Sequence, residues 1–403
     1  MIYTFYSFKG GVGRSMAMAG VAYHFAQRGL KVLAIDFDLE APGLERYFFD
    51  GERCKSVRAQ PGLMDLILDY RSALSSAALY EKGDFKIWKN YCTPAIYSTG
   101  PTQGSVDLMT AGRREPESAL RNYALAVRSF DWQDFFYNAK GNLFFDWLRR
   151  RLLEPEGGYD VVLVDSRTGV TEMGGVCAYQ LADVAVLLCA ANFQNLEGTR
   201  DVARDFRSES VRALRLGRPL EIVAVPARIE SEHPRRAEFL ARFKEELGID
   251  GLPMELAKVG LDYEALAIPY LPAFSVAERL VGEPPPSEEG SSPPVDAFER
   301  LADALTLLAS EQSRLYELRG AAKARLTGAA ATDSVALIAD TTRSSAGYDA
   351  FIDCVREDLE VATQIVSALE QAGQRIFLDN TSLSAAVDFQ TSVEHALEYS
   401  QTV

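Results

Sequence analysis

The chain has 403 residues, of which 47% are hydrophobic and 25% charged, the profile of a folded protein with an apolar core. Its net charge of −15 opposes unspecific attraction to nucleic acid or anionic lipid, although it does not exclude a local basic patch. The sequence shows neither a long apolar run nor a signal-peptide pattern, so we expect a cytoplasmic protein without a membrane span.

The first 45 residues predict a strand, a glycine-rich loop, a helix over 16–27 and a second strand. Short apolar runs, separated by segments of helical character, continue beyond them. Because these runs lack polar alternation, they predict an α/β fold with a doubly wound parallel sheet covered by helices on both faces. The predicted strands span residues 2–6, 30–35, 106–109, 161–164, 184–188 and 222–225.

Longer connections interrupt this pattern. Residues 46–105 and 113–158 exceed simple crossovers and are rich in aromatic residues, so we interpret them as insertions. Residues 283–294 contain five prolines, which is typical of a linker, and Asp296 is expected to cap a helix of about 25 residues. The predicted domains are therefore 1–282, a linker plus helix at 283–333, and a last αβ unit at 334–403.

The glycine-rich loop after the first strand reads Lys9-Gly10-Gly11-Val12-Gly13-Arg14-Ser15. Backbone N–H groups of such a loop, together with the positive end of the following helix dipole, hold phosphate oxygens. Its glycines permit positive φ angles, and Ser15 offers a hydroxyl ligand to Mg²⁺. The loop therefore predicts binding of a nucleoside triphosphate with Mg²⁺.

This loop resembles the deviant Walker A motif of the MinD/ParA, or SIMIBI, class of P-loop ATPases. The resemblance implies ATP and Mg²⁺ as cofactors and an ATP-sandwich homodimer, in which Lys9 reaches the phosphates of the partner subunit. Arg14 stands where the class has a second lysine; it keeps the positive charge but changes its shape, which implies slow hydrolysis. The implied nucleotide contacts in the loop are Gly10, Gly11, Val12, Gly13, Arg14, Ser15 and Met16.

Two further segments resemble the same class. Residues 35–44 are similar to the segment after the second strand, whose aspartates organise Mg²⁺ and the attacking water; alternatively, the aspartates cap a turn. Residues 161–165 end an apolar strand in a carboxylate that would hold Mg²⁺ through water. The implied metal-binding residues are Ser15, Asp36, Asp38 and Asp165. The implied catalytic residues are Lys9, Arg14 and Asp38.

Weaker resemblances add three candidates for nucleotide contacts. Gly169 fits a switch that touches the γ-phosphate, while Pro226 and Arg228 occupy the place where the class reads the base. Arg167 stands where proline is commoner, and it serves either as a charge-stabilising finger or in a structural ion pair. Residues 268–272 fit the last strand of the class.

The last part of the chain alternates as a strand, a helix and a second strand, which by composition is a generic αβ unit. Residues 348–379 resemble the start of a TIR domain, and that resemblance implies self-association. Some TIR domains cleave NAD⁺ with a glutamate. Ser392 stands at the corresponding position, and Glu394 is the nearest acid, so we expect no NAD⁺ cleavage.

Together these features predict an ATP-dependent, dimerising switch that controls TIR–TIR association in bacterial defence or stress signalling. One alternative is a ParA-like DNA-partition ATPase, for which Arg200, Arg204 and Arg207 on one helix face would bind nucleic acid. The acidic net charge favours a solvated face instead. The other alternative, a TIR effector that cleaves NAD⁺, is disfavoured by Ser392. We therefore expect neither nucleic acid nor a membrane as a partner.

Overall fold

The structure is a computed structural model. It describes residues 1–74, 86–97, 104–154, 158–169, 176–270, 293–328, 350–353 and 376–379. The chain divides into two compact units, Met1–Ala329 and Ala330–Val403, each of which is described by itself.

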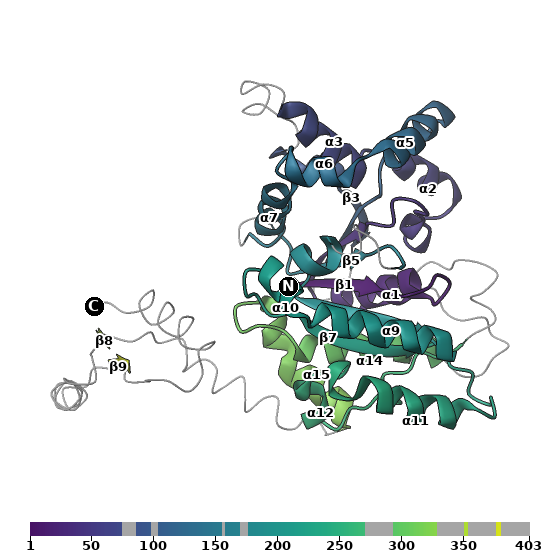
Figure 1. Ribbon diagram of the computed structural model, residues 1–403, viewed down its shortest axis with the longest axis vertical. Helices are drawn as coiled ribbons and strands as arrows, with labels where there is room; N and C mark the ends of the chain where they lie inside the picture. Colours follow the sequence, from purple (N-terminus) through teal and green to yellow (C-terminus); the bar gives the residue numbers. More distant parts are fainter. Residues whose placement is uncertain are drawn as a thin grey trace. The chain divides into compact units, whose positions relative to one another are not determined.

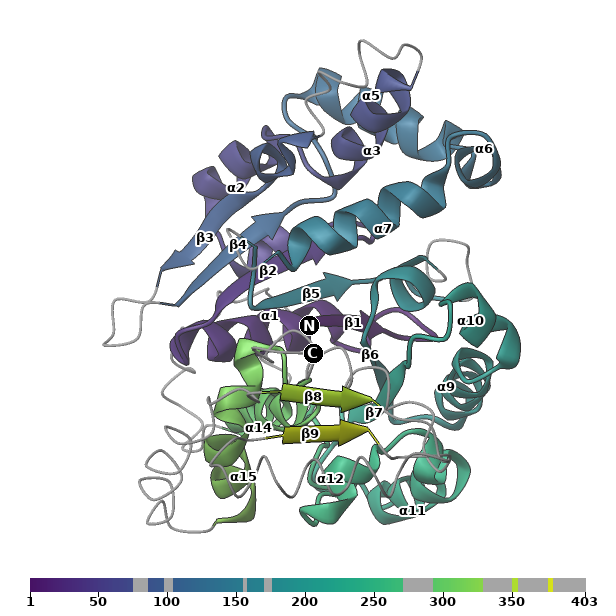
Figure 2. The ribbon, with the colours of Figure 1, turned by 90° about the vertical axis from the view of Figure 1, so that its left-hand side faces the viewer.

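The first unit is built on one sheet. Its described strands are β1 (Ile2–Tyr6), β2 (Lys31–Asp36), β3 (Thr93–Tyr97), β4 (Ser105–Met109), β5 (Val161–Asp165), β6 (Val184–Ala190) and β7 (Glu221–Ala227). They lie in the order β3-β4-β2-β5-β1-β6-β7, and Figure 2 shows β5, β1 and β6 side by side in the middle. All neighbouring pairs are parallel except β3 with β4.

Helices cover both faces of this sheet (Figure 1). The bounds are α1 (Arg14–Gln27), α2 (Gly51–Arg58), α3 (Leu63–Ala73), α5 (Glu117–Ser129), α6 (Trp132–Tyr137), α7 (Gly141–Leu152), α9 (Phe193–Phe206), α10 (Glu209–Leu214), α11 (Arg236–Leu247), α12 (Met254–Lys258), α14 (Pro293–Leu307) and α15 (Arg319–Thr327). Successive strand residues point to opposite faces. In β2, Val32 and Ala34 pack in the core layer of α1 and α14, whereas Leu33 and Ile35 pack in the layer of α3 and α7. The predicted α/β fold with a mainly parallel sheet is thereby confirmed.

The two predicted insertions form a helical layer with an aromatic core. Tyr70 of α3 lies 4.7 Å, centroid to centroid, from Phe144 of α7, and Phe135 of α6 packs edge-on against Phe144 and Phe145. All four rings are buried. Aromatic pairs in such tilted and edge-to-face arrangements contribute about 0.5–1.5 kcal/mol each beyond the burial of their area. The aromatic richness seen in the sequence therefore serves packing.

All six predicted strands are present, but the edge of the sheet differs from the prediction. The sequence analysis missed β3, which pairs antiparallel with β4 and carries a register shift after Pro94. Proline cannot donate to a ladder and is tolerated at such an edge. The strand predicted at 268–272 is wrong for the described residues, since Pro269 makes only an isolated bridge with Ile229.

The single long helix predicted from Asp296 is also wrong. α14 ends at Leu307, and a 3-10 turn at Arg314–Leu318 leads into α15. Ser310 and Ser313 lie in the break, where serine hydroxyls compete with helical hydrogen bonds. Most of the predicted linker and the side chain of Asp296 lie outside the described residues.

α14 is part of the first unit, although the sequence analysis placed it with a linker. Leu301 and Leu305 are at most 1% exposed in the core beneath α1, and the hydroxyl of Tyr3 donates to the Leu305 carbonyl at 3.0 Å. The compact unit accordingly runs to Ala329. The segment after the prolines thus completes the core of the sheet.

The contact between α1 and α14 can be tested at Gly20. A Cβ added there would come within 2.5 Å of the Phe298 ring, whereas one added at Gly320 in α15 would meet no atom within 4 Å. We expect Gly20→Ala to be less stable than Gly320→Ala by about 1–3 kcal/mol because it overpacks the contact. Urea denaturation measures both variants, and equal stabilities would contradict the packing.

The second unit contains two described strands, β8 (Ala350–Asp353) and β9 (Ile376–Asp379), which pair in parallel. They match the two strands predicted for this segment. The predicted helix between them, the loop after β9, Ser392 and Glu394 lie outside the described residues. Among the helices that the structure describes, none is long and apolar enough to cross a membrane.

Candidate functional site

The glycine-rich loop joins the carboxyl end of β1 to the amino end of α1. Gly11 and Gly13 have φ angles of 75° and 87°, the left-handed region that favours glycine. The Gly13 carbonyl accepts the first helical hydrogen bond, from Ala17 N at 3.0 Å. A Cβ added at Gly10 or Gly11 would meet no atom within 4 Å, so this side of the loop is open. The open loop and the helix amino end together form an anion-binding arrangement.

Two predicted contact residues of the loop face the core instead. Val12 is 2% exposed, and Met16 packs against the same cluster. Only their backbone could face a ligand on the open side. These side chains anchor the loop to the sheet.

Arg14, the first residue of α1, turns into the protein. Its guanidinium Nη2 lies 3.0 Å from Asp38 Oδ2, and its Nε donates to Asp165 Oδ1. Its Nη1 lies 3.5 Å from the hydroxyl oxygen of Ser7. Arg14 is only 7% exposed, so the pairs are shielded from water. The structure thus brings together three predicted site residues, in an ion-paired cluster.

Asp165 lies opposite Asp36 in the register of β5 with β2. Burial raises the pKa of Asp165, while the Arg14 charge and a hydrogen bond from Ser15 act in the opposite direction. Burial, followed by the charges of Asp165 and Glu45, raises the pKa of Asp36 to about 8. This edge of the sheet therefore gathers buried carboxyl groups whose charged forms are disfavoured by burial.

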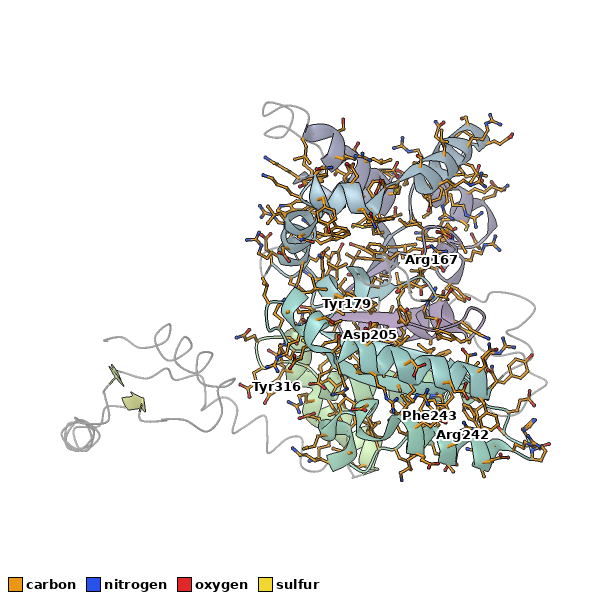
Figure 3. All side chains as sticks on the ribbon, in the orientation of Figure 1. Arg167, Tyr179, Asp205, Arg242, Phe243 and Tyr316 are labelled. Atoms are coloured by element: carbon orange, nitrogen blue, oxygen red, sulfur yellow. The ribbon has the colours of Figure 1, made fainter. Side chains whose placement is uncertain are left out.

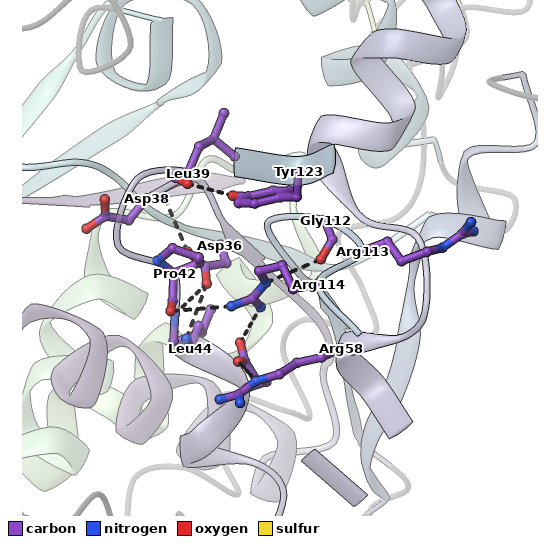
Figure 4. A network of polar contacts seen from close by, with 12 residues as sticks. Asp36, Asp38, Leu39, Pro42, Leu44, Arg58, Gly112, Arg113, Arg114 and Tyr123 are labelled. Atoms are coloured by element: carbon purple, nitrogen blue, oxygen red, sulfur yellow. Dashed lines mark hydrogen bonds and ion pairs between the residues drawn. The ribbon is translucent and has the colours of Figure 1, made fainter. Parts of the chain in front are cut away.

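Asp36 uses its oxygens differently from the other predicted metal-binding residues. They accept backbone N–H groups of Asp38 at 3.2 Å, Gly43 at 3.1 Å and Leu44 at 3.2 Å. These bonds fold the segment after β2 into a turn (Figure 4). The turn-capping alternative therefore describes Asp36, while Asp38 pairs with Arg14.

A buried ion-pair network holds the end of this turn. Glu45, which is 0% exposed, binds Arg58 Nε at 2.6 Å and Arg114 Nη2 at 2.9 Å. Arg114 also donates to the Gly112 carbonyl, and Tyr123 donates to the Leu39 carbonyl at 2.6 Å. Figure 4 shows Arg58 and Arg114 converging beside the turn. The sequence analysis did not single out Glu45.

Lys9 is the first residue of the loop, and Gly169 contacts the segment just before it. The Lys9 ammonium donates to the side chain of Gln194 in α9. The Gly169 N–H donates to Ser7 O at 3.3 Å, and its carbonyl accepts from Tyr6, so Gly169 is fixed at the end of β1. Gly169 therefore lies close to the start of the loop.

The two predicted base contacts differ in position. Pro226 lies within β7, paired with Cys189, and is buried. Arg228 follows that strand and donates to the Gly11 carbonyl at 2.6 Å, while its guanidinium lies 4.7 Å from the Tyr270 ring centroid. Only Arg228 directly contacts the loop.

A cavity of about 590 Å³ opens beside the loop. Residues 9–11, the connection from β6 to α9, and the start of α11 line it. Asn195 lines it too; it is 3% exposed, and its side-chain oxygen has no hydrogen-bond partner. Gln194 and Asn195 were not predicted, although polar residues after the carboxyl end of an apolar strand are the usual signal for a site.

Arg167 forms an ion pair with Glu40 in the segment after β2 (Figure 3). Of its two predicted roles, the structural ion pair is therefore present.

Arg200 of α9 and Arg207, which directly follows this helix, contact α11 and the turn after it. Arg200 lies 3.2 Å from Glu246 of α11, and Arg207 donates to the Asp250 carbonyl. Arg242 of α11, which Figure 3 labels, stacks 4.7 Å from the ring centroid of Phe193. The solvated, charge-balanced face predicted from the sequence matches these contacts.

Residues 3–178 match the protein family described as CobQ/CobB/MinD/ParA nucleotide binding domain. The matched segment includes the loop, Asp38 and Asp165. No curated protein matches the chain significantly.

Three solved structures are among those similar to this chain. MinD from Pyrococcus horikoshii, complexed with Mg-ADP, is 18% identical; the match covers 78% of this chain and 98% of that one, with a TM-score of 0.44. A McdA variant from Cyanothece in complex with ATP is 16% identical, with coverages of 77% and 98% and a TM-score of 0.47. Cobyrinic acid a,c-diamide synthase from Mycobacterium smegmatis, with an ATP analog and magnesium, is 15% identical, with coverages of 75% and 93% and a TM-score of 0.46.

Proposed function

We propose that the first unit binds ATP with Mg²⁺, hydrolyses it slowly and acts as a switch. The observation that carries this proposal is the open glycine loop at the amino end of α1, which lies directly beside Asp38 and Asp165. The family match of residues 3–178 supports it. The three similar structures hold ADP, ATP and an ATP analog as their ligands.

The residues present fit both groups. The open side of the loop leaves room for phosphates, and Ser15, Asp38 and Asp165 offer the oxygen ligands that Mg²⁺ prefers. Within the described part of the chain, no three acidic, histidine or cysteine side chains gather closely enough to hold a metal ion by themselves. Phosphate oxygens and water would therefore complete its shell, and the bound ion would neutralise phosphate charge.

Slow turnover follows from the residue that replaces the usual lysine. Arg14 is occupied by two carboxylates, and one of them, Asp38, is the residue we assign to positioning the attacking water. A carboxylate whose oxygen accepts from a guanidinium is not free to orient a water molecule. Both groups would have to rearrange before hydrolysis.

We further propose that ATP drives formation of a homodimer through Lys9. Lys9 lies at the rim of the open loop and is bound only through its flexible end to Gln194, a neutral partner. A lysine on a flexible stem can exchange such a partner for a phosphate. The dimer would bring the C-terminal segments together, and their TIR-like sequence suggests a role in bacterial defence or stress signalling by analogy alone.

The test is the mass in solution with and without ATP and Mg²⁺, together with phosphate release. We expect the wild type to double its mass with ATP, and Lys9→Ala to stay monomeric while nucleotide affinity changes only a few-fold. Lys258→Ala, at an exposed lysine of α12, is the control and should behave as the wild type. A wild type that neither binds nucleotide nor changes mass would refute the switch.

A further inference from the structure

The basic residue of the phosphate loop serves the protein's own carboxylates. All three guanidinium nitrogens of Arg14 face protein oxygens: Asp165 Oδ1, Asp38 Oδ2 at 3.0 Å and Ser7 Oγ at 3.5 Å. Asp165 is 3% and Asp38 15% exposed. Each nitrogen of the guanidinium therefore has a partner inside the protein, and these contacts use three of its five N–H donors.

Asp38 and Asp165 are also the carboxylates that our proposed function assigns to Mg²⁺ and water. A guanidinium and a divalent cation would compete for the same oxygens. In a site shielded from water, two positive charges a few ångströms apart repel strongly. The present position of Arg14 thus opposes the binding of a divalent cation between Asp38 and Asp165.

Arginine has a second natural partner at this place. Its planar fork binds phosphate in a bidentate manner, and the open side of the same loop lies at Gly10 and Gly11. A negatively charged phosphate there would offer the guanidinium new oxygens. The carboxylates released in that exchange would then be free for a cation.

We infer that Arg14 is an internal counterion, which keeps the Asp38–Asp165 pair closed to divalent cations until phosphates on the loop attract the guanidinium away. This inference rests on the proposed function, because it names how the same site is regulated. According to this inference, the divalent cation binds tightly only when a nucleotide is bound to the loop. By linkage, the cation strengthens nucleotide binding by the same factor.

The test measures binding of Mn²⁺ alone, followed by its electron paramagnetic resonance signal, to the full chain without nucleotide. Arg14→Gln removes the guanidinium charge and leaves both carboxylates. Arg28→Gln is the matched control, since Arg28 directly follows the same helix and is a largely buried arginine, 12% exposed and 2.9 Å from Asp303. We expect Arg14→Gln to bind Mn²⁺ at least tenfold more tightly than the wild type and Arg28→Gln. We also expect Mn²⁺ to raise the melting temperature of Arg14→Gln alone.

A folded Arg14→Gln variant with wild-type affinity for Mn²⁺ would overturn the inference. So would a wild type that binds ATP but binds Mn²⁺ equally well with and without it. If Arg14→Gln does not fold, Arg14→Lys replaces it: its single ammonium cannot span both carboxylates, so we expect an intermediate gain, and no gain refutes the counterion.

A separate measurement tests the proposed function itself. It is the binding of a fluorescent ATP analogue to the wild type in EDTA and in Mg²⁺. Absent nucleotide binding with an intact Mn²⁺ difference rejects the switch and keeps the counterion.

Discussion

Replacing Glu45 by alanine is expected to lower the free energy of unfolding of the first unit by about 3–5 kcal/mol, the usual cost of breaking a buried ion pair. Glu45 is 0% exposed and neutralises both Arg58 and Arg114. Its removal leaves two arginines without their carboxylate, and Arg114 is only 7% exposed. Since the total free energy of unfolding of a folded protein is about 5–15 kcal/mol, we expect the first unit to lose much of its stability.

The pH dependence provides a second measurement on the same residue. Burial alone would raise the pKa of Glu45, but the ion pairs with Arg114 and Arg58 outweigh it and lower the pKa below its ordinary 4.5. A carboxylate whose pKa is lower in the folded than in the unfolded chain stabilises the folded state. This stabilisation is complete at a pH above the pKa in the unfolded chain, and it is lost as the pH falls through the pKa in the folded state. The gap between wild type and Glu45→Ala should therefore be constant near neutral pH and narrow below about pH 4.5.

Urea denaturation at several pH values checks both expectations. Glu52→Ala is the control, because Glu52 forms an ion pair with Lys55 on the adjacent helix but is 89% exposed. Exposed pairs contribute little, so no measurable change is expected. A Glu45→Ala variant as stable as Glu52→Ala would show that the turn after β2 does not depend on this network.

Removal of the Glu45 carboxylate should also disturb the candidate functional site around Asp38. Glu45 follows the turn that Asp36 caps, and Asp38 lies within that turn. Arg114, released from Glu45, also donates to the Pro42 carbonyl of the same turn. A loosened turn would therefore misplace Asp38, and we attribute to Glu45 a supporting role in the site as well as in the fold.

The parts of this fold that the sequence predicted are those with a local signature. Strands such as 161–164 and 184–188 are apolar on both faces, which only a covered sheet satisfies. The glycines of the loop have few other uses between a strand and a helix. The edge strand β3 lacked such a signature, because Pro94 interrupts it and its pairing with β4 is antiparallel.

The site required information that the sequence does not contain. An arginine at position 14 is compatible with a phosphate outside or with carboxylates inside, and only the approach of Asp38 and Asp165 distinguishes them. Lys9 and Gln194 are 185 residues apart, so no spacing rule connects them. Asp36 and Asp38 look equivalent as a strand-end pair, yet the fold turns one toward the backbone and the other toward Arg14.

Nucleotide binding itself should depend on the backbone of Gly13. Its φ of 87° is accessible to glycine but strained for a β-branched residue. Gly13→Val should therefore change the backbone conformation of the loop. Hydrogen bonds to charged groups contribute about 1.5–3 kcal/mol each, so misplacing two N–H donors should weaken nucleotide binding by about 100-fold or more.

The matched control is Gly260→Val, since Gly260 has a φ of 81° and no atom within 4 Å of an added Cβ. Both variants carry a similar backbone strain of about 1–3 kcal/mol, so their melting temperatures should fall alike. Titration with a fluorescent ATP analogue then distinguishes the effect of backbone strain from an effect on the phosphate site. Only Gly13→Val should lose affinity for the analogue. If Gly13→Val and Gly260→Val bind the ATP analogue with equal affinity, the loop does not hold the phosphates. Since both variants lose similar stability, a difference in affinity between them can only come from the amino end of α1.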